Sequence, residues 1–255
     1  MSSILDKFKL DGKVAVVTGA ARGLGQGMAL ALAEAGADIV AVDVLPADDT
    51  KKQVEGLGRK CLTIAANLSD RTSITPLIAE ARQHYGHLDI LVNCAGIIRR
   101  EDFVNFSEKD WDDVMGINID AVFLLSQAFV RDVISRNGTG KIINIASMLS
   151  FQGGIRVPSY TASKSAVQGL TRLMANELAA KGINSNAIAP GYMATDNTAP
   201  LRADEKRSAA ILDRIPAGRW GTPDDLKGAV VFLASSASDY INGYTVAVDG
   251  GWLAR

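Results

Sequence analysis

The chain has 255 residues, of which 47% are hydrophobic and 22% charged, and its formal net charge is -1. This length suits one α/β domain with a sizeable buried core, and the balanced charge gives no basic field for a polyanion, so we expect no nucleic acid partner. Cys61 and Cys94 form no CxxC pair and have no histidine cluster beside them, which predicts no metal site and two reduced thiols, as in cytoplasmic proteins.

The amino-terminal segment, residues 1–11, mixes charged residues into a short apolar pattern and has no signal-peptide core. No later run approaches the roughly 20 consecutive apolar residues of a membrane span. We therefore expect a cytoplasmic protein with no membrane partner.

Short β-rich runs alternate with longer amphipathic runs along the chain. Several β-rich runs are apolar almost throughout, as strands covered by helices on both faces are, and the alternation indicates repeated strand-helix units. The sequence therefore predicts one catalytic domain over residues 1–255, an α/β doubly wound Rossmann fold with a seven-stranded parallel sheet and helices on both faces. The predicted strands are residues 13–18, 38–42, 60–65, 88–93, 141–145, 184–189 and 245–248.

A glycine-rich turn, T-G-A-A-R-G-L-G at residues 18–25, follows the first predicted strand. Glycines here let the backbone turn tightly and approach a pyrophosphate at the N-terminus of the next helix. Any tight strand-to-helix loop can show the same pattern, but Asp43 ends the second strand where a carboxylate reaches the ribose hydroxyls. The two features together favour a dinucleotide site.

Asp43 also bears on the choice of cofactor. A carboxylate accepts hydrogen bonds from a free ribose 2'-OH but repels a 2'-phosphate, so the sequence favours NAD over NADP. Arg22 argues for NADP, since a guanidinium in this turn can pair with the phosphate. We give the carboxylate more weight.

Tyr160 and Lys164 are four residues apart, so they share one face of a predicted helix. An ammonium beside a phenol stabilises the phenolate, and moving the phenol pKa from about 10 towards 7 requires roughly 4 kcal/mol. An exposed helix pair has the same spacing. Ser147, however, follows the strand 141–145 at the carboxyl edge of the sheet, where doubly wound folds bind ligands, and this favours a proton-transfer site.

These motifs together resemble the short-chain dehydrogenase/reductase family over the whole chain. The matching pieces are residues 18–25, 93–96, Asn118, Ser147, Tyr160 with Lys164, and residues 190–191. The resemblance implies that Tyr160 exchanges a proton with the substrate oxygen while Ser147 hydrogen-bonds it. It also implies that Lys164 lowers the tyrosine pKa and holds the nicotinamide ribose, and that Asn118 holds a water linking Lys164 to solvent.

The resemblance further implies a set of cofactor-binding residues, with two departures from the family pattern. Asn67 and Leu68 stand where an aspartate usually meets the adenine, and Cys94 stands where asparagine is common. The implied cofactor residues are Gly19, Arg22, Gly23, Leu24, Gly25, Asp43, Asn67, Leu68, Asn93, Ala95, Gly96, Tyr160, Lys164, Pro190, Gly191, Met193 and Thr195.

Three further segments, residues 97–102, 148–158 and 242–252, resemble a subgroup of bacterial 2-deoxy-D-gluconate 3-dehydrogenases, also called 2-dehydro-3-deoxy-D-gluconate 5-dehydrogenases, of pectin and uronate breakdown. This implies a sugar acid substrate, whose carboxylate needs a cation. Arg100 and Arg156 are the candidates, although either can be a solvated surface arginine. Gln152 and Trp220 complete the candidate substrate residues, and the family resemblance implies a homotetramer.

The sequence also fits other functions. One is a relative acting on a polyol or a 3-hydroxyacyl substrate, and another is a nucleotide-binding sensor without chemistry, although a sensor has no need of Ser147, Tyr160 and Lys164 together. Residues 192–220 are polar and poorly periodic, which fits either a mobile lid or an ordinary surface excursion. His84 and His87 flank a turn with no third ligand, so no metal is predicted there.

Overall fold

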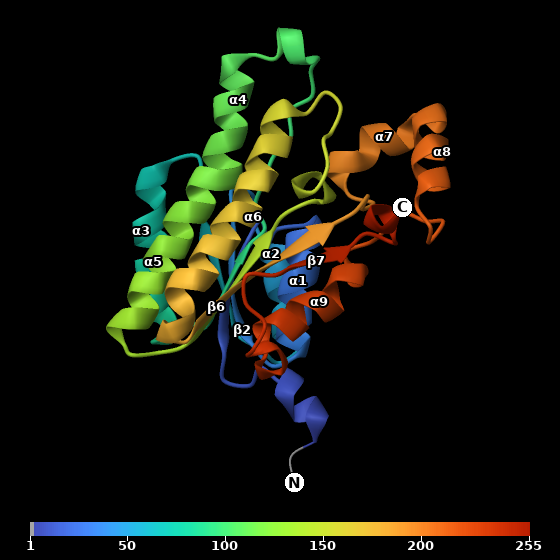
Figure 1. Cartoon of the computed structure of the whole chain (residues 1–255). Helices are drawn as coiled ribbons and strands as arrows, with labels where there is room; N and C mark the ends of the chain where they lie inside the picture. Colours follow the sequence, from blue (N-terminus) through green and yellow to red (C-terminus); the bar gives the residue numbers. More distant parts are fainter. Residues whose placement is uncertain (1–2) are drawn as a thin grey trace.

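The computed structural model describes residues 3–255. The segment 1–11 is predicted to have no signal-peptide core, and its first two residues, Met1 and Ser2, lie outside the described residues. Seven strands form one parallel sheet in the order β3-β2-β1-β4-β5-β6-β7 (Figure 1), which confirms the predicted fold class. Each strand lies within two residues of its predicted bounds. The strands are β1 Val14–Thr18, β2 Asp38–Asp43, β3 Cys61–Ala65, β4 Ile90–Asn93, β5 Gly140–Ile145, β6 Ile183–Pro190 and β7 Thr245–Val248.

Helices cover both faces of the sheet, as Figure 1 shows. Ala15 and Val17 of β1 pack in one core with α1, α2 and α9, whereas Val14 and Val16 pack in the other with α3, α5 and α6. Because successive side chains of a strand point to opposite faces, a strand buried on both sides is apolar at nearly every position. The helices are α1 Gly23–Glu34, α2 Asp48–Gly56, α3 Ile74–Tyr85, α4 Glu108–Met115, α5 Ala121–Ser135, α6 Pro158–Leu178, α7 Ala199–Ala203, α8 Glu205–Arg214 and α9 Asp224–Ala234.

The helical segment Glu108–Ser135 joins α4 and α5 through a π-helical turn, Gly116–Asp120. By length and composition it could cross a membrane, with a mean hydropathy of 1.4 over its most apolar window. Core helices meet the same criterion, and Leu125, Phe129 and Val133 pack in the core against α3. Polar residues interrupt this helix, so it contains no unbroken apolar run of about 20 residues.

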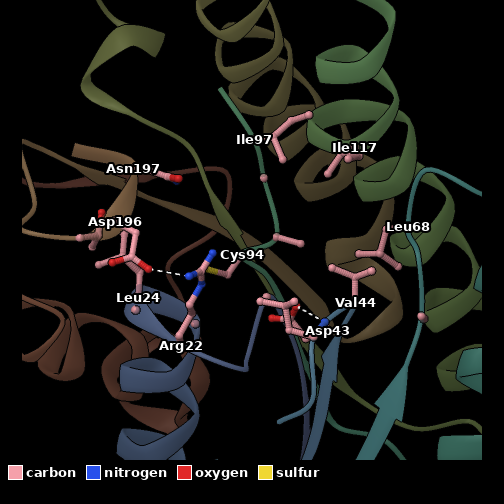
Figure 2. A pocket seen from close by; sticks show the side chains of 18 of the residues that line it. Arg22, Leu24, Asp43, Val44, Leu68, Cys94, Ile97, Ile117, Asp196 and Asn197 are labelled. Carbon is pink, nitrogen blue, oxygen red and sulfur yellow. Dashed lines mark hydrogen bonds and ion pairs between the residues drawn. The ribbon is translucent and has the colours of Figure 1, made fainter. Parts of the chain in front are cut away.

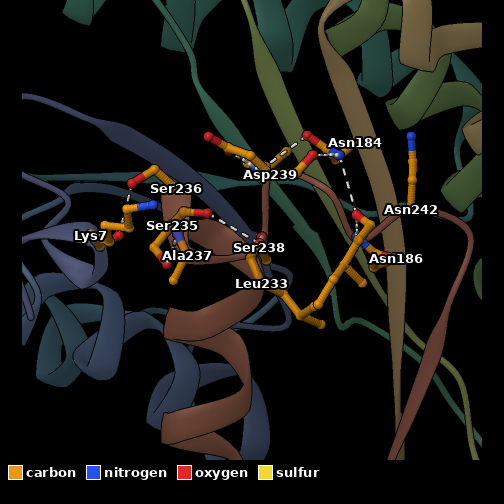
Figure 3. Close-up of polar contacts among 12 residues, drawn as sticks. Lys7, Asn184, Asn186, Leu233, Ser235, Ser236, Ala237, Ser238, Asp239 and Asn242 are labelled. Atoms are coloured by element: carbon orange, nitrogen blue, oxygen red, sulfur yellow. Dashed lines mark hydrogen bonds and ion pairs between the residues drawn. The ribbon is translucent and has the colours of Figure 1, made fainter. Parts of the chain in front are cut away.

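Polar side chains at the amino edge of the sheet hold the connection between α9 and β7 (Figure 3). The buried Asn186 of β6 donates a hydrogen bond to the carbonyl of Ile241 at 2.8 Å and accepts one from the amide of Tyr244 at 3.0 Å. Asn242 accepts a hydrogen bond from the amide of Ser185 at 2.8 Å. These bonds fix the path by which the chain enters the last strand.

The segment 192–220 folds as a packed helical excursion near the C-terminus (Figure 1). Ile211 and Ile215, at the end of α8, lie in a small apolar cluster with Met148 and Trp252. The segment therefore covers the residues that follow β5 at the carboxyl edge of the sheet.

Candidate active site

A cleft of about 280 Å³ opens at the carboxyl ends of β1 to β4 (Figure 2). It lies where the strand order reverses direction around β1 and β4, the place where doubly wound folds bind their ligands. Most of the predicted cofactor residues line it. Those lining the cleft are Gly19, Arg22, Gly23, Leu24, Gly25, Asp43, Asn67, Leu68, Ala95, Gly96 and Thr195.

The glycine-rich turn has the geometry that a pyrophosphate needs. Gly19 has a φ of +70°, and a Cβ there would lie 3.0 Å from the Cα of Ala95. A Cβ on Gly25 would lie 2.0 Å from the carbonyl oxygen of Gly19, whereas one on Gly23 would meet nothing within 4 Å. The turn is thus tightly packed against backbone at Gly19 and Gly25 but has free space at Gly23, on the side of the cleft. There the first N-H groups of α1 favour an anion.

Asp43 ends β2 beside this turn. Its two carboxylate oxygens accept hydrogen bonds from the amides of Ala21 at 2.9 Å and Leu45 at 3.0 Å. A carboxylate has about four acceptor positions, so it can still bind ribose hydroxyls. Together, the glycine cradle and this carboxylate fit a dinucleotide.

Besides Tyr160 and Lys164, four predicted cofactor residues do not line this cleft, and their contact with the cofactor stays a prediction. Asn93 is buried and donates hydrogen bonds to Ser126 and Asn144, so it lies beneath the cleft. The Met193 side chain is buried against Gly221. Pro190 is buried, and Gly191 packs against Asp249. A motif gives the position of a residue along the chain but not the direction of its side chain.

The cleft is also lined by residues that were not among the predicted cofactor residues. Some follow directly after a strand or belong to the matched turn, and position alone could have suggested them. Ile117 lies in the π-helical turn, which no sequence signal predicted, and Asp196 and Asn197 belong to the excursion after β6. The additional lining residues are Val44, Leu45, Ala66, Cys94, Ile97, Ile117, Asp196 and Asn197.

Tyr160 and Lys164 lie on one face of α6, as predicted. The Lys164 Nζ is 5.7 Å from the centroid of the Tyr160 ring and donates a hydrogen bond to the carbonyl oxygen of Ile145 at 2.6 Å. Lys164 is only 4% exposed, and burial lowers its pKa from the usual 10.5 to about 8. This lysine can therefore change its protonation state near neutral pH.

The pKa of the Tyr160 phenol is raised above its usual value of 10.0 by the chain's own groups. Burial is the largest cause, and it is opposed by a hydrogen bond with Ser147 and by the positive charge of Arg100. The partly dry site thus favours the neutral phenol more than the cations of the chain favour the phenolate. The positive charge of Arg100 partly opposes this rise of the pKa.

Asn118 lies fully buried in the π-helical turn. Its side chain accepts a hydrogen bond from the amide of Ile97 at 2.9 Å and donates to the carbonyl of Ile97 at 3.0 Å and to Ser163 at 3.2 Å. It therefore joins the loop after β4 to α6, close to Lys164. Its predicted role in holding a water stays a prediction.

The candidate substrate residues separate into two groups. The positive charge of Arg100 acts on the Tyr160 phenol, and the guanidinium donates a hydrogen bond to the carbonyl of Asn197 at 3.1 Å. Arg156 instead forms ion pairs with Glu101 at 3.4 Å and Asp102 at 3.0 Å, so its charge is already neutralised. Gln152 accepts a hydrogen bond from the Arg214 guanidinium at 3.3 Å. Trp220 packs edge-on against Tyr192, with the ring centroids 5.5 Å apart.

The sequence profile of a family described as Enoyl-(Acyl carrier protein) reductase matches residues 19–253. The chain belongs to the short-chain dehydrogenase/reductase family. Membership confirms the prediction of an oxidoreductase enzyme with a bound nucleotide cofactor. Among residues 3–255, no group of three or more histidine, cysteine or acidic side chains gathers as a metal site would require.

Relatives within the short-chain dehydrogenase/reductase family match this chain over nearly its whole length. The 2-dehydro-3-deoxy-D-gluconate 5-dehydrogenase of Escherichia coli is 66% identical over 99% of this chain and 100% of its own, and that of Bacillus subtilis is 53% identical over 100% of both. A solved protein of Agrobacterium tumefaciens, proposed to be a 2-deoxy-D-gluconate 3-dehydrogenase and holding NADP, is 51% identical with a TM-score of 0.92 and covers 98% of this chain and 99% of its own. The gluconate 5-dehydrogenase of Burkholderia cenocepacia, in complex with NADP and tartrate, is 40% identical with a TM-score of 0.94 and covers 99% of this chain and 100% of its own.

Proposed function

We propose that this enzyme is an NAD-dependent dehydrogenase that interconverts a secondary alcohol and a ketone on a deoxy sugar acid, as a 2-dehydro-3-deoxy-D-gluconate 5-dehydrogenase does. The observation that carries the proposal is the convergence of Ser147, Tyr160 and Lys164 beside a dinucleotide cleft, in a chain 66% identical to an enzyme of that name. The Ser147 hydroxyl acts on the Tyr160 phenol and lowers its pKa, so one substrate oxygen could contact both groups.

The reaction needs a proton acceptor and a site for developing negative charge. In the direction of oxidation, the bound nicotinamide supplies the acceptor for the hydride that leaves the carbinol carbon. Tyr160, as the phenolate, accepts the proton from the substrate hydroxyl, and the Ser147 hydroxyl donates a hydrogen bond to the same oxygen. Arg100 and Lys164 are the nearby cations of this chain that stabilise the phenolate.

The preference for NAD rests on Asp43, whose carboxylate would repel a 2'-phosphate. The Agrobacterium and Burkholderia relatives hold NADP, so NADP is the alternative cofactor. Steady-state kinetics with both cofactors test the preference. We expect kcat/KM to be at least tenfold larger with NAD, and a larger value with NADP would overturn this part of the proposal.

Arg100 is the best-placed cation for the substrate carboxylate. Its charge acts on the Tyr160 phenol, so it lies near the reacting oxygen, whereas Arg156 is occupied by two carboxylates. The tartrate in the Burkholderia relative is itself a hydroxy acid. A sugar acid with its hydroxyl at Tyr160 and its carboxylate at Arg100 would fit this arrangement.

Absorbance at the NADH band, followed with a panel of substrates, separates this function from its rivals. The panel holds deoxy keto sugar acids, neutral polyols and 3-hydroxyacyl thioesters, each with NAD or NADH as required. We expect turnover with the deoxy sugar acids and little with the others. Preferred turnover of a polyol or thioester would move the enzyme to another branch of the family, and NAD binding without any turnover would indicate a sensor.

We also propose that the enzyme assembles as a homotetramer in the cytoplasm and serves the breakdown of pectin-derived sugar acids. Apolar side chains on the outer helices support assembly, since Trp111, Phe123 and Leu173 are 40%, 46% and 51% exposed. Light scattering coupled to size-exclusion chromatography tests the assembly. A mass of one subunit at micromolar concentration would contradict it.

A further inference from the structure

An ion pair spans the cofactor cleft between two segments far apart in the sequence. The Arg22 guanidinium, from the turn after β1, lies 2.7 Å from the carboxylate of Asp196, in the first turn of the excursion after β6. Both residues line the cleft, and Figure 2 shows the pair beside Asp43. The side chains are 66% and 72% exposed, so the pair lies at the mouth of the cleft and not in the core.

The backbone of Arg22 lies next to the expected ribose site. The amide of its neighbour, Ala21, donates to the Asp43 carboxylate at 2.9 Å, and Asp43 is the residue that marks the ribose hydroxyls. A long guanidinium side chain that begins there could pair with a 2'-phosphate. In this structure the guanidinium points instead to Asp196.

We propose that Asp196 is a cofactor-specificity residue that holds Arg22 away from the 2'-phosphate of NADP. Two carboxylates then act against NADP by different routes: Asp43 repels the phosphate directly, and Asp196 competes for the arginine that would neutralise it. NAD has no 2'-phosphate and loses nothing when Arg22 stays with Asp196. The inference rests on the proposed nicotinamide cofactor but not on the sugar acid substrate.

The expected effect is modest because the pair is exposed. Replacing Asp196 by asparagine should improve the affinity for NADP relative to NAD by about two- to fivefold, the size of an exposed ion pair. The gain should fall as ionic strength rises, because screening weakens both the pair and the contact with phosphate.

The test is isothermal titration calorimetry of NAD and NADP with the full-length protein. The variants are Asp196→Asn, Arg22→Gln and the double variant, with Glu205→Gln as a control that removes an exposed carboxylate from the same segment outside the cleft. We expect the Kd for NADP to fall relative to the Kd for NAD in Asp196→Asn. This ratio should return to the unsubstituted value in the double variant and stay unchanged in the control.

Three outcomes would overturn the inference. They are an unchanged ratio in Asp196→Asn, a shift that persists without Arg22, and an equal change in the affinity for both cofactors. The measurement needs no substrate, so it separates this inference from the proposed function. A shift in the ratio without turnover of any sugar acid would sustain the role of Asp196 and remove the proposed substrate.

Discussion

The ammonium of Lys164 binds the carbonyl oxygen of Ile145, at the last position of β5 and two residues before Ser147. The bond fixes one end of α6 to the strand that delivers the serine. It also leaves a positive charge in a buried site, where burial lowers the pKa to about 8. The position of the charge therefore has an energetic cost.

Replacing Lys164 by methionine should stabilise the fold while abolishing turnover. A pKa lowered from 10.5 to about 8 means that burying the ammonium costs about 3 kcal/mol at pH 7, and losing the bond to Ile145 offsets about 1 kcal/mol of the gain. The folded protein releases this proton before the unfolded chain does, so the cost disappears as pH rises from about 8 to 10.5. Measured by urea unfolding, the difference in the free energy of unfolding between the variant and the unsubstituted protein should shrink by about 2 kcal/mol between pH 7 and 9.5.

Lys181→Met is the matched control, because Lys181 is exposed. Its stability relative to the unsubstituted protein should not change with pH over the same range. A constant difference between Lys164→Met and the unsubstituted protein at all pH values would contradict the assigned pKa.

Replacing Tyr160 by phenylalanine should lower kcat/KM by about 100- to 10,000-fold, the usual contribution of a positioned proton-transfer group. Ser147→Ala should also lower kcat, since the substrate oxygen loses a donor. Calorimetry should give a Kd for NAD within about twofold of the unsubstituted value in both variants, because the phenyl ring keeps its packing. Tyr240→Phe, at a fully exposed position, is the control, and comparable turnover in Tyr160→Phe and this control would exclude the mechanism.

Arg100→Gln should raise the KM for a sugar acid by about 10- to 100-fold, the value of a charge-assisted hydrogen bond, and leave the KM for a neutral analogue nearly unchanged. Arg156→Gln should have little effect, because Glu101 and Asp102 already neutralise that guanidinium. Arg100 lowers the pKa of Tyr160, so its removal raises that pKa. The pH profile of alcohol oxidation should therefore move to higher pH, and an unmoved profile would count against the contact.

Asn186→Ala should destabilise the fold without altering the kinetics of the folded enzyme. The change leaves the amide of Tyr244 without its partner and removes one of the two side-chain donors to the carbonyl of Ile241, the other being Asn184, at a cost of about 1 to 3 kcal/mol. Urea unfolding measures the loss, with Asn105→Ala at an exposed site for comparison. Since the network lies at the amino edge, kcat and KM of the remaining folded enzyme should match the unsubstituted values.

The strands and the phosphate-binding turn could be predicted because local chemistry determines them. Residues 14–17 of β1 are all apolar because both faces of the strand are buried. Gly19 and Gly25 occupy positions where a Cβ would collide with backbone atoms. Tyr160 and Lys164 were predictable for the same reason, because helical spacing alone sets their shared face.

Side-chain direction and long-range pairing could not be predicted in this way. Met193 follows a strand and fits the motif, yet its side chain packs inward on Gly221, 28 positions along the chain. The ion pairs of Arg156 and of Arg22 depend on how loops close over the sheet, which no periodicity encodes. The raised pKa of Tyr160 depends on how much water the assembled site excludes.

The side-chain bond between Asn93 and Asn144 has a consequence for folding accuracy. The two residues are directly paired between β4 and β5, and both are buried, with Nδ2 of Asn93 donating to Oδ1 of Asn144 at 2.8 Å. If one of these strands slipped by one position, its asparagine would turn to the opposite face of the sheet and both amides would lose this hydrogen bond, at a cost of several kcal/mol. The pair thereby selects a single alignment, and that alignment brings Ala95 after β4, which lines the cofactor cleft, and Ser147 after β5 to the same edge of the sheet at nearly the same height.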